Sequence, residues 1–120
     1  YIPEHTHIPV SRRTPPPTGE ETLAKEYLRS VDPYIALAAA STCTERIRLG
    51  TGIGLVAQPD PITFAKQIAT LDPLCDGRFV FGIGYGWNVE EMAHPGVGFR
   101  TRRAQVREHV LAMRERWICL

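Results

Sequence analysis

The sequence has few cysteines, no long apolar run and almost no net charge, and each shortage excludes a class of protein. The three cysteines, Cys43, Cys75 and Cys119, are far apart and form no CxxC pair, which excludes a disulfide framework and a zinc-finger pattern. A membrane-spanning helix needs about 20 consecutive apolar residues, and no segment comes near that length. With 14 Lys and Arg against 13 Asp and Glu, the net charge of +1 gives no electrostatic reason to expect nucleic acid or a membrane as a partner.

The remaining composition is that of an ordinary globular protein. Hydrophobic residues make up 43% and charged residues 22% of the 120 positions, so the chain can bury a core. The start, YIPEHTHIPV, has no basic segment followed by an apolar one, as a signal peptide would, and we therefore predict a cytoplasmic protein. Because the chain opens without Met on a strand-like segment, we expect one partial domain, residues 1–120, with N- and C-terminal portions missing.

Two Asp-Pro pairs predict where the first helices begin. In Asp32-Pro33 and in Asp60-Pro61, an N-cap residue precedes a proline at the first helical position. The Ala-rich segment after the first pair predicts a buried helix that ends near Thr44. The segment after the second predicts a helix that Pro73 stops, with Phe64, Ile68 and Leu71 on one face.

Strand patterns alternate with these helices. Residues 1–4 resemble the end of a strand that runs into a long Pro-rich loop, and residues 46–56 and 78–84 resemble parallel strands that end in glycines. Residues 101–117 predict a last helix, with Val106, Val110, Met113 and Trp117 on one face and solvated arginines elsewhere. This βα order predicts an α/β fold, either a doubly wound sheet or a TIM barrel, of which the chain supplies at most about half.

The working residues of α/β folds lie at the carboxyl ends of the strands. At the first end, Glu4 and His5 join a carboxylate to the side chain that titrates nearest neutrality, which suits proton transfer, although the start of a solvated loop has the same pattern. His5 and His7 also have the spacing of two metal ligands on one strand face. The later strand ends carry glycines where further ligands would be needed, so we predict no metal site.

The second and third strand ends are rich in glycine. Gly50, Gly52 and Gly54 indicate a bulge or a close backbone approach to a ligand. The segment GIGYGWN precedes a helical stretch, a context in which backbone amides can receive phosphate, but it has no GxGxxG, which weakens a Rossmann interpretation. Trp87 is either a rim aromatic packed on its own barrel or a surface on which a ring can stack, and Tyr85 is equally ambiguous.

Taken in order, PEHTHIP, DPYIALAAASTCTERIRLGTGIGL, QPDPITFAKQIATLD and GRFVFGIGYGWNVEEM resemble the luciferase-like monooxygenase family, in its branch dependent on coenzyme F420. The resemblance implies an α/β fold that is a partial TIM (β/α)8 barrel, about strands 2 to 4 with their helices. It also implies hydride transfer between F420 and an organic substrate, and a homodimer. The alternatives are an FMN-dependent monooxygenase of the same fold and an inactive truncated barrel, which the ending RERWICL would fit because it leaves the family pattern.

The same resemblance implies roles for individual residues. His5 would transfer a proton, and Glu4 would orient His5 or touch the coenzyme. A non-prolyl cis peptide at Gly52-Ile53 would bulge against the coenzyme ring. The residues implied to bind the coenzyme are Thr51, Gly52, Ile53, Gly84, Tyr85, Gly86, Trp87 and Asn88.

Overall fold

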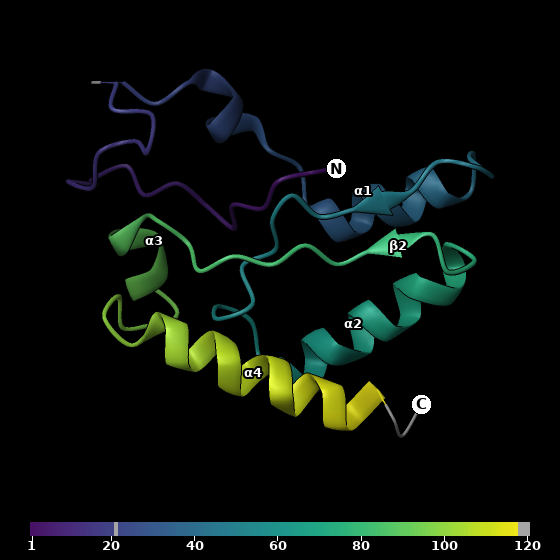
Figure 1. Ribbon diagram of the computed structural model, residues 1–120. Helices are drawn as coiled ribbons and strands as arrows, with labels where there is room; N and C mark the ends of the chain where they lie inside the picture. Colours follow the sequence, from purple (N-terminus) through teal and green to yellow (C-terminus); the bar gives the residue numbers. More distant parts are fainter. Residues whose placement is uncertain (21, 118–120) are drawn as a thin grey trace.

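The computed structural model describes residues 1–20 and 22–117, with only the backbone of Trp117, so the predictions for Cys119 and for the side chain of Trp117 lie outside the described residues. Strands and helices alternate along the chain, as predicted. Helices α2 and α4 run together below the strands in Figure 1, and the N-terminal loop lies on the opposite side. The elements are η1 (Lys25–Arg29), α1 (Pro33–Ser41), β1 (Leu49–Gly50), α2 (Pro61–Leu74), β2 (Phe79–Val80), α3 (Val89–Ala93) and α4 (Arg102–Trp117).

The strands are parallel and short. Leu49 of β1 is paired with Phe79 of β2, and the pairing resumes beyond both strands at Gly54 and Ile83. Ile2 adds a third parallel segment on the other side of β1, since its N–H donates to Gly50 O at 2.9 Å and its carbonyl accepts from Gly52 N. The order of the three segments is therefore the order along the chain, as consecutive βα units require.

Both predicted N-caps are present. Asp32 Oδ1 accepts from the backbone N–H of Tyr34 at 2.9 Å, and Asp60 Oδ1 accepts from that of Thr63 at 2.8 Å. Helix α1 ends at Ser41, three residues short of the predicted Thr44. Hydroxyl groups explain the early end, because those of Ser41, Thr42 and Thr44 bond back to the carbonyls of Ala38, Ala39 and Ala40 and compete with helical hydrogen bonds.

The prediction that Pro73 stops α2 was wrong, because Pro73 lies inside the helix, which ends at Leu74. A proline in the last turn forfeits one backbone hydrogen bond, and the turn is held by Cys75 N–H, which donates to Leu71 O at 3.0 Å. The chain then reverses at Asp76 and Gly77, with φ of 50° and 69°, a left-handed conformation that Asp and Gly tolerate.

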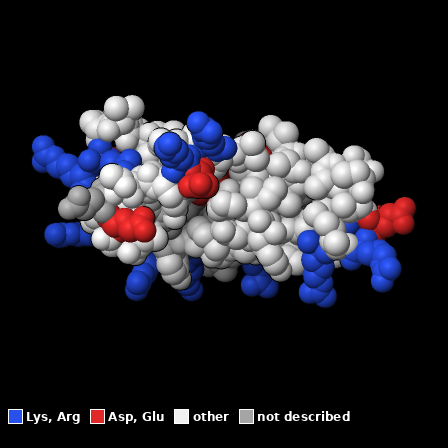
Figure 2. All heavy atoms as spheres, turned by 90° about the horizontal axis from the view of Figure 1, so that it is seen from above, with Lys and Arg blue, Asp and Glu red and all other residues white. Residues whose placement is uncertain are grey.

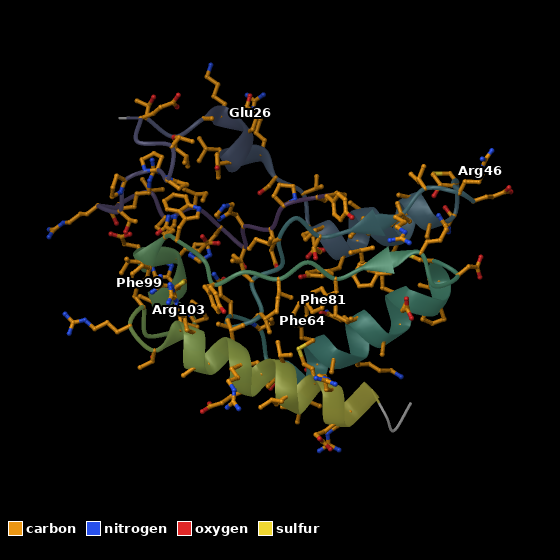
Figure 3. The ribbon with its side chains drawn as sticks, viewed as in Figure 1. Glu26, Arg46, Phe64, Phe81, Phe99 and Arg103 are labelled. Carbon is orange, nitrogen blue, oxygen red and sulfur yellow. The ribbon has the colours of Figure 1, made fainter. Side chains whose placement is uncertain are left out.

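The main core lies between α2, α4 and the strands. Phe64 and Ile68 of α2 pack with Met92, Val106 and Met113, all buried. In Figure 3, Phe64 and Phe81 point toward each other between the helices and the strands, and their rings meet edge to face at 5.7 Å. The predicted stripe on α2 is thereby confirmed, as are Val106 and Met113 on α4.

Two burial predictions need correction. Helix α1 is buried on one face only, through Pro33, Leu37 and Ser41, while Ile35 is 73% exposed. Arg102 is half-buried rather than solvated, because its guanidinium lies 3.7 Å above the ring of Phe99. Within the described residues, no helix is long and apolar enough to cross a membrane.

Candidate functional site

An open cleft of about 570 Å³ lies at the carboxyl ends of the three strand segments. Its floor is formed by the segments that follow Ile2, β1 and β2, and its cover by Pro17 and by Glu26, Tyr27 and Ser30 in and beside η1. The lining is mainly apolar, with carboxylates at Glu4 and Glu26. Viewed from the side of η1, Figure 2 shows one group of basic and acidic side chains within the face and others around its rim, with broad uncharged surface between them.

The cleft brings together most of the predicted site. The predicted residues that line it are Glu4, His5, Gly52, Ile53, Gly84, Tyr85, Gly86 and Trp87. They come from three strand ends that are far apart in sequence and adjacent in the parallel sheet, which is why their carboxyl ends meet at one edge.

The segment after β1 forms the predicted bulge. The Gly52–Ile53 peptide is cis, as the family resemblance implied. The Ile53 side chain lies across Gly84, where an added Cβ would collide with Ile53 Cδ1 and lie 2.8 Å from its Cγ1. Glycine at position 84 is therefore required for Ile53 to lie where it does.

His5 is held by a residue that the sequence analysis did not single out. His5 Nδ1 lies 2.8 Å from Glu91 Oε2, and the two side chains are 10% and 2% exposed. Glu91 Oε1 accepts from the N–H of Thr6 at 3.1 Å, so one carboxylate bonds both to the imidazole and to the backbone next to it. The alternative that Glu4 orients His5 is thereby corrected, because that role belongs to Glu91.

Glu4 points to different partners. Its Oε2 accepts from Tyr34 Oη at 2.8 Å and from the N–H of Leu55 at 2.6 Å. Burial raises the pKa of Glu4 above its usual range, against the lowering effect of these two hydrogen bonds. Burial, followed by the nearby Glu4 carboxylate, also raises the pKa of Tyr34.

Aromatic rings surround His5. Trp87 meets the imidazole edge-on at 5.8 Å, and Tyr27 of η1 approaches it at 5.2 Å. Tyr27 and Trp87 also contact each other edge to face at 6.2 Å. Trp87 thus packs on the imidazole and on the cover of the cleft, and the Pro-rich loop, through η1, closes one side of the site.

Two predicted coenzyme-binding residues do not line the cleft. Thr51 is 1% exposed and donates its hydroxyl to Gly82 O at 2.7 Å, which ties two strand segments together. Asn88 is fully buried, and its Oδ1 caps α3 by accepting from Glu91 N–H at 3.0 Å. Its Nδ2 has no hydrogen-bond partner within the part of the chain that the structure describes.

The phosphate interpretation of the turn before α3 is not supported by its hydrogen bonds. The amide of Glu91 is taken by Asn88, and that of Val89 donates to Thr14 Oγ1 at 3.3 Å. These bonds occupy amides that a phosphate would use.

The two histidines that suggested metal ligands diverge. His5 turns to Glu91, whereas His7 Nε2 lies 2.6 Å from His94 Nδ1. Among the described residues there is no group of three or more His, Cys, Asp or Glu that could hold a metal ion.

The sequence carried one signal for Glu91. Asn88 followed three residues later by Glu91 matches a capping box, in which the glutamate bonds back to its own N-cap. In the structure its carboxylate goes to His5 and Thr6 instead. No comparable local pattern marks Tyr27 or Tyr34.

Comparison with known proteins gives consistent results. The family described as luciferase-like monooxygenase matches residues 4–118. An uncharacterized protein of Mycobacterium tuberculosis is 50% identical over 119 residues, which cover 98% of this chain and 42% of that protein. An F420-dependent glucose-6-phosphate dehydrogenase of Intrasporangium calvum is 38% identical over 87 residues, which cover 68% of this chain and 26% of the enzyme. The chain thus spans less than half the length of these relatives.

Solved structures confirm the predicted fold class. Monooxygenase RslO1 from Streptomyces bottropensis superposes with a TM-score of 0.69 at 33% identity, over 79% of this chain and 29% of that one. The oxygenating constituent of 3,6-diketocamphane monooxygenase from Pseudomonas putida, solved with FMN, gives a TM-score of 0.67 at 24% identity, over 72% and 25% of the two chains. The second likeness concerns the fold alone. Together they identify the α/β arrangement as part of a TIM barrel.

Proposed function

The chain belongs to the luciferase-like monooxygenase family, and from that premise we propose that it carries the coenzyme-binding part of an oxidoreductase that transfers hydride between coenzyme F420 and an organic substrate. The observation that carries the proposal is the convergence of three strand ends on one cleft. His5, the Ile53 bulge and the segment from Gly84 to Trp87 all line it. A planar ring with an apolar body and polar edges suits such a lining.

The residues present fit a flat ring system. The cleft volume of about 570 Å³ is within the range of small-molecule sites, about 300–1,000 Å³. Gly84 leaves room for Ile53 to lie against the third strand end, so backbone and one aliphatic side chain form one wall.

The bound coenzyme would supply a ring carbon that accepts or donates hydride. His5 would transfer the proton that accompanies the reaction. Glu91 occupies Nδ1, which leaves Nε2 as the nitrogen that can gain or lose a proton. A carboxylate only accepts hydrogen bonds, so Glu91 keeps the proton of neutral His5 on Nδ1. Tyr27 and Trp87 restrict water on the side of the imidazole that they cover.

The second candidate is an FMN-dependent monooxygenase of the same fold. Two observations favour it: monooxygenase RslO1 is 33% identical over 79% of this chain, and the fold is shared with a monooxygenase constituent that was solved with FMN. The residues that line the cleft serve either ring, so binding must separate the two.

The test is a titration of the purified 120-residue chain with F420 and, separately, with FMN, followed by fluorescence. Saturable binding of F420, with FMN weaker, supports the proposal. Binding of FMN alone would refute the choice of coenzyme, and binding of neither would favour the inactive-fragment alternative. Gly84→Val, which drives a side chain into Ile53, should weaken binding, whereas Ala39→Ser on the exposed face of α1 should leave it unchanged.

A further inference from the structure

Directly after the Cα of Ile53, at the tip of the bulge, the backbone makes two hydrogen bonds to a single residue, Glu4. The backbone N–H of Glu4 donates to Ile53 O at 3.2 Å. The carboxylate of Glu4 accepts from the N–H of Leu55 at 2.6 Å, two residues further along. Glu4 therefore holds the two peptide groups that flank Gly54, directly after Ile53, whose side chain lines the cleft.

Tyr34 fixes the carboxylate of Glu4. Its hydroxyl donates to the same Oε2 at 2.8 Å, and its ring packs edge to face on Phe64 at 5.1 Å. A Cβ added to Gly54 would lie 2.7 Å from Tyr34 Oη, so the hydroxyl rests directly against the bulge backbone. Helix α1 thus supports, through one tyrosine, both the carboxylate and the segment that the carboxylate holds.

The Glu4 carboxylate is engaged in holding the bulge segment. Oε2 already receives two hydrogen bonds, and the 2.6 Å contact with Leu55 N is short, as charge-assisted bonds are. In His5, by contrast, Glu91 holds Nδ1, and Nε2 is the nitrogen that can transfer a proton. Glu4 therefore holds the backbone in place, whereas His5 is the residue that can transfer a proton.

We propose that Glu4 is a positioning residue that, together with Tyr34, clamps the segment from Ile53 to Leu55 so that Ile53 keeps its place in the coenzyme cleft. The clamp itself is a property of the chain. Its consequence for coenzyme binding rests on the proposed function.

Three variants separate clamping from direct action on a ligand. Glu4→Gln keeps an oxygen that can accept from Leu55 N–H, Glu4→Ala removes every acceptor, and Tyr34→Phe removes only the supporting hydroxyl. Glu45→Gln is the control, since Glu45 is exposed in the loop after α1 and does not line the cleft.

The first measurement needs no coenzyme. Amide hydrogen exchange of Leu55, followed by NMR, should accelerate about ten-fold in Glu4→Ala because the buried N–H loses its acceptor. It should stay near wild type in Glu4→Gln and in the control, and rise in Tyr34→Phe. The wild-type Leu55 amide shift should also titrate with a carboxyl group, and Glu4→Gln should abolish that titration.

The second measurement is fluorescence titration with F420 and with FMN. Affinity should fall about ten-fold in Glu4→Ala and be retained in Glu4→Gln. Unchanged Leu55 exchange in Glu4→Ala would overturn the clamp. So would loss of affinity in Glu4→Gln with Leu55 still protected, because the carboxylate would then act on the ligand directly.

Failure of the proposed function has a different signature. If the wild-type chain binds neither coenzyme, the proposed function fails. The clamp is then tested only by the amide exchange of Leu55 in the variants. If Glu4→Ala does not fold, Tyr34→Phe and Glu4→Gln decide it, with far-UV circular dichroism to show that both retain the fold.

Discussion

Replacing Glu91 with Gln is expected to release His5 and to destabilise the chain. Glu91 is 1% exposed, and its two carboxylate oxygens serve Thr6 N–H and His5 Nδ1. A carboxylate accepts both hydrogen bonds, whereas an amide has one accepting oxygen and must turn its NH₂ toward the other donor. As long as the proton of His5 stays on Nδ1, one of the two donors is then left without an acceptor.

The magnitude follows from that orphaned donor. Leaving a buried donor unpaired costs about 1–3 kcal/mol of unfolding free energy. For a chain of this size, 1 kcal/mol corresponds to about 4 °C in Tm, so we expect a decrease of about 4–12 °C. The control is Glu45→Gln in the exposed loop after α1, which should change the unfolding free energy by less than about 0.5 kcal/mol.

Two assays test this reasoning. Thermal unfolding followed by circular dichroism gives Tm for both variants, and ¹⁵N NMR of the imidazole shows which nitrogen of His5 carries the proton. Wild-type neutral His5 should carry it on Nδ1, and Glu91→Gln should lose that preference. If Tm and the His5 tautomer both stay unchanged in Glu91→Gln, Glu91 does not hold His5 and the argument for Nε2 fails.

Three further outcomes are expected. Phe64→Ala should cost about 3–5 kcal/mol in urea unfolding because Phe64 is 1% exposed in the main core, whereas Ile62→Ala on the exposed face of α2 should cost far less. The Thr14 hydroxyl and the Arg13 backbone N–H lower the pKa of Glu90 to about 2, so this contact stabilises the loop above the usual glutamate pKa and is lost as pH falls toward about 2. Amide exchange of Thr14 against pH should show this loss, and Glu90→Gln should not. Burial raises the pKa of Glu4, so its contribution to stability is complete below the unfolded-state pKa and is lost as pH rises through the folded-state pKa. Over that window, urea midpoints should fall more steeply with pH in wild type than in Glu4→Gln.

Much of the fold could be predicted from short-range patterns. Asp32-Pro33 and Asp60-Pro61 each place an N-cap beside a proline, and both helices begin there. The spacing of Phe64, Ile68 and Leu71 predicted the buried face of α2. These predictions succeeded because the groups involved lie within a few residues of one another, so the local sequence contains both partners.

The ends of elements were harder to predict. Thr44 lies beyond the end of α1 because hydroxyl groups compete for its last carbonyls. Pro73 stays inside α2 because its position in the last turn limits the cost to one hydrogen bond. Both outcomes depend on a balance of small energies that residue type alone does not settle.

By itself the sequence determined the βα order, the family, and the glycine-rich strand ends whose residues meet in one cleft. Only the tertiary structure decided which carboxylate serves which neighbour. Glu91 reaches His5 across 86 residues, and Tyr34 reaches Glu4 across 30. Such pairs exist only after α1 and α3 have packed against the parallel strands, so no local pattern could specify them.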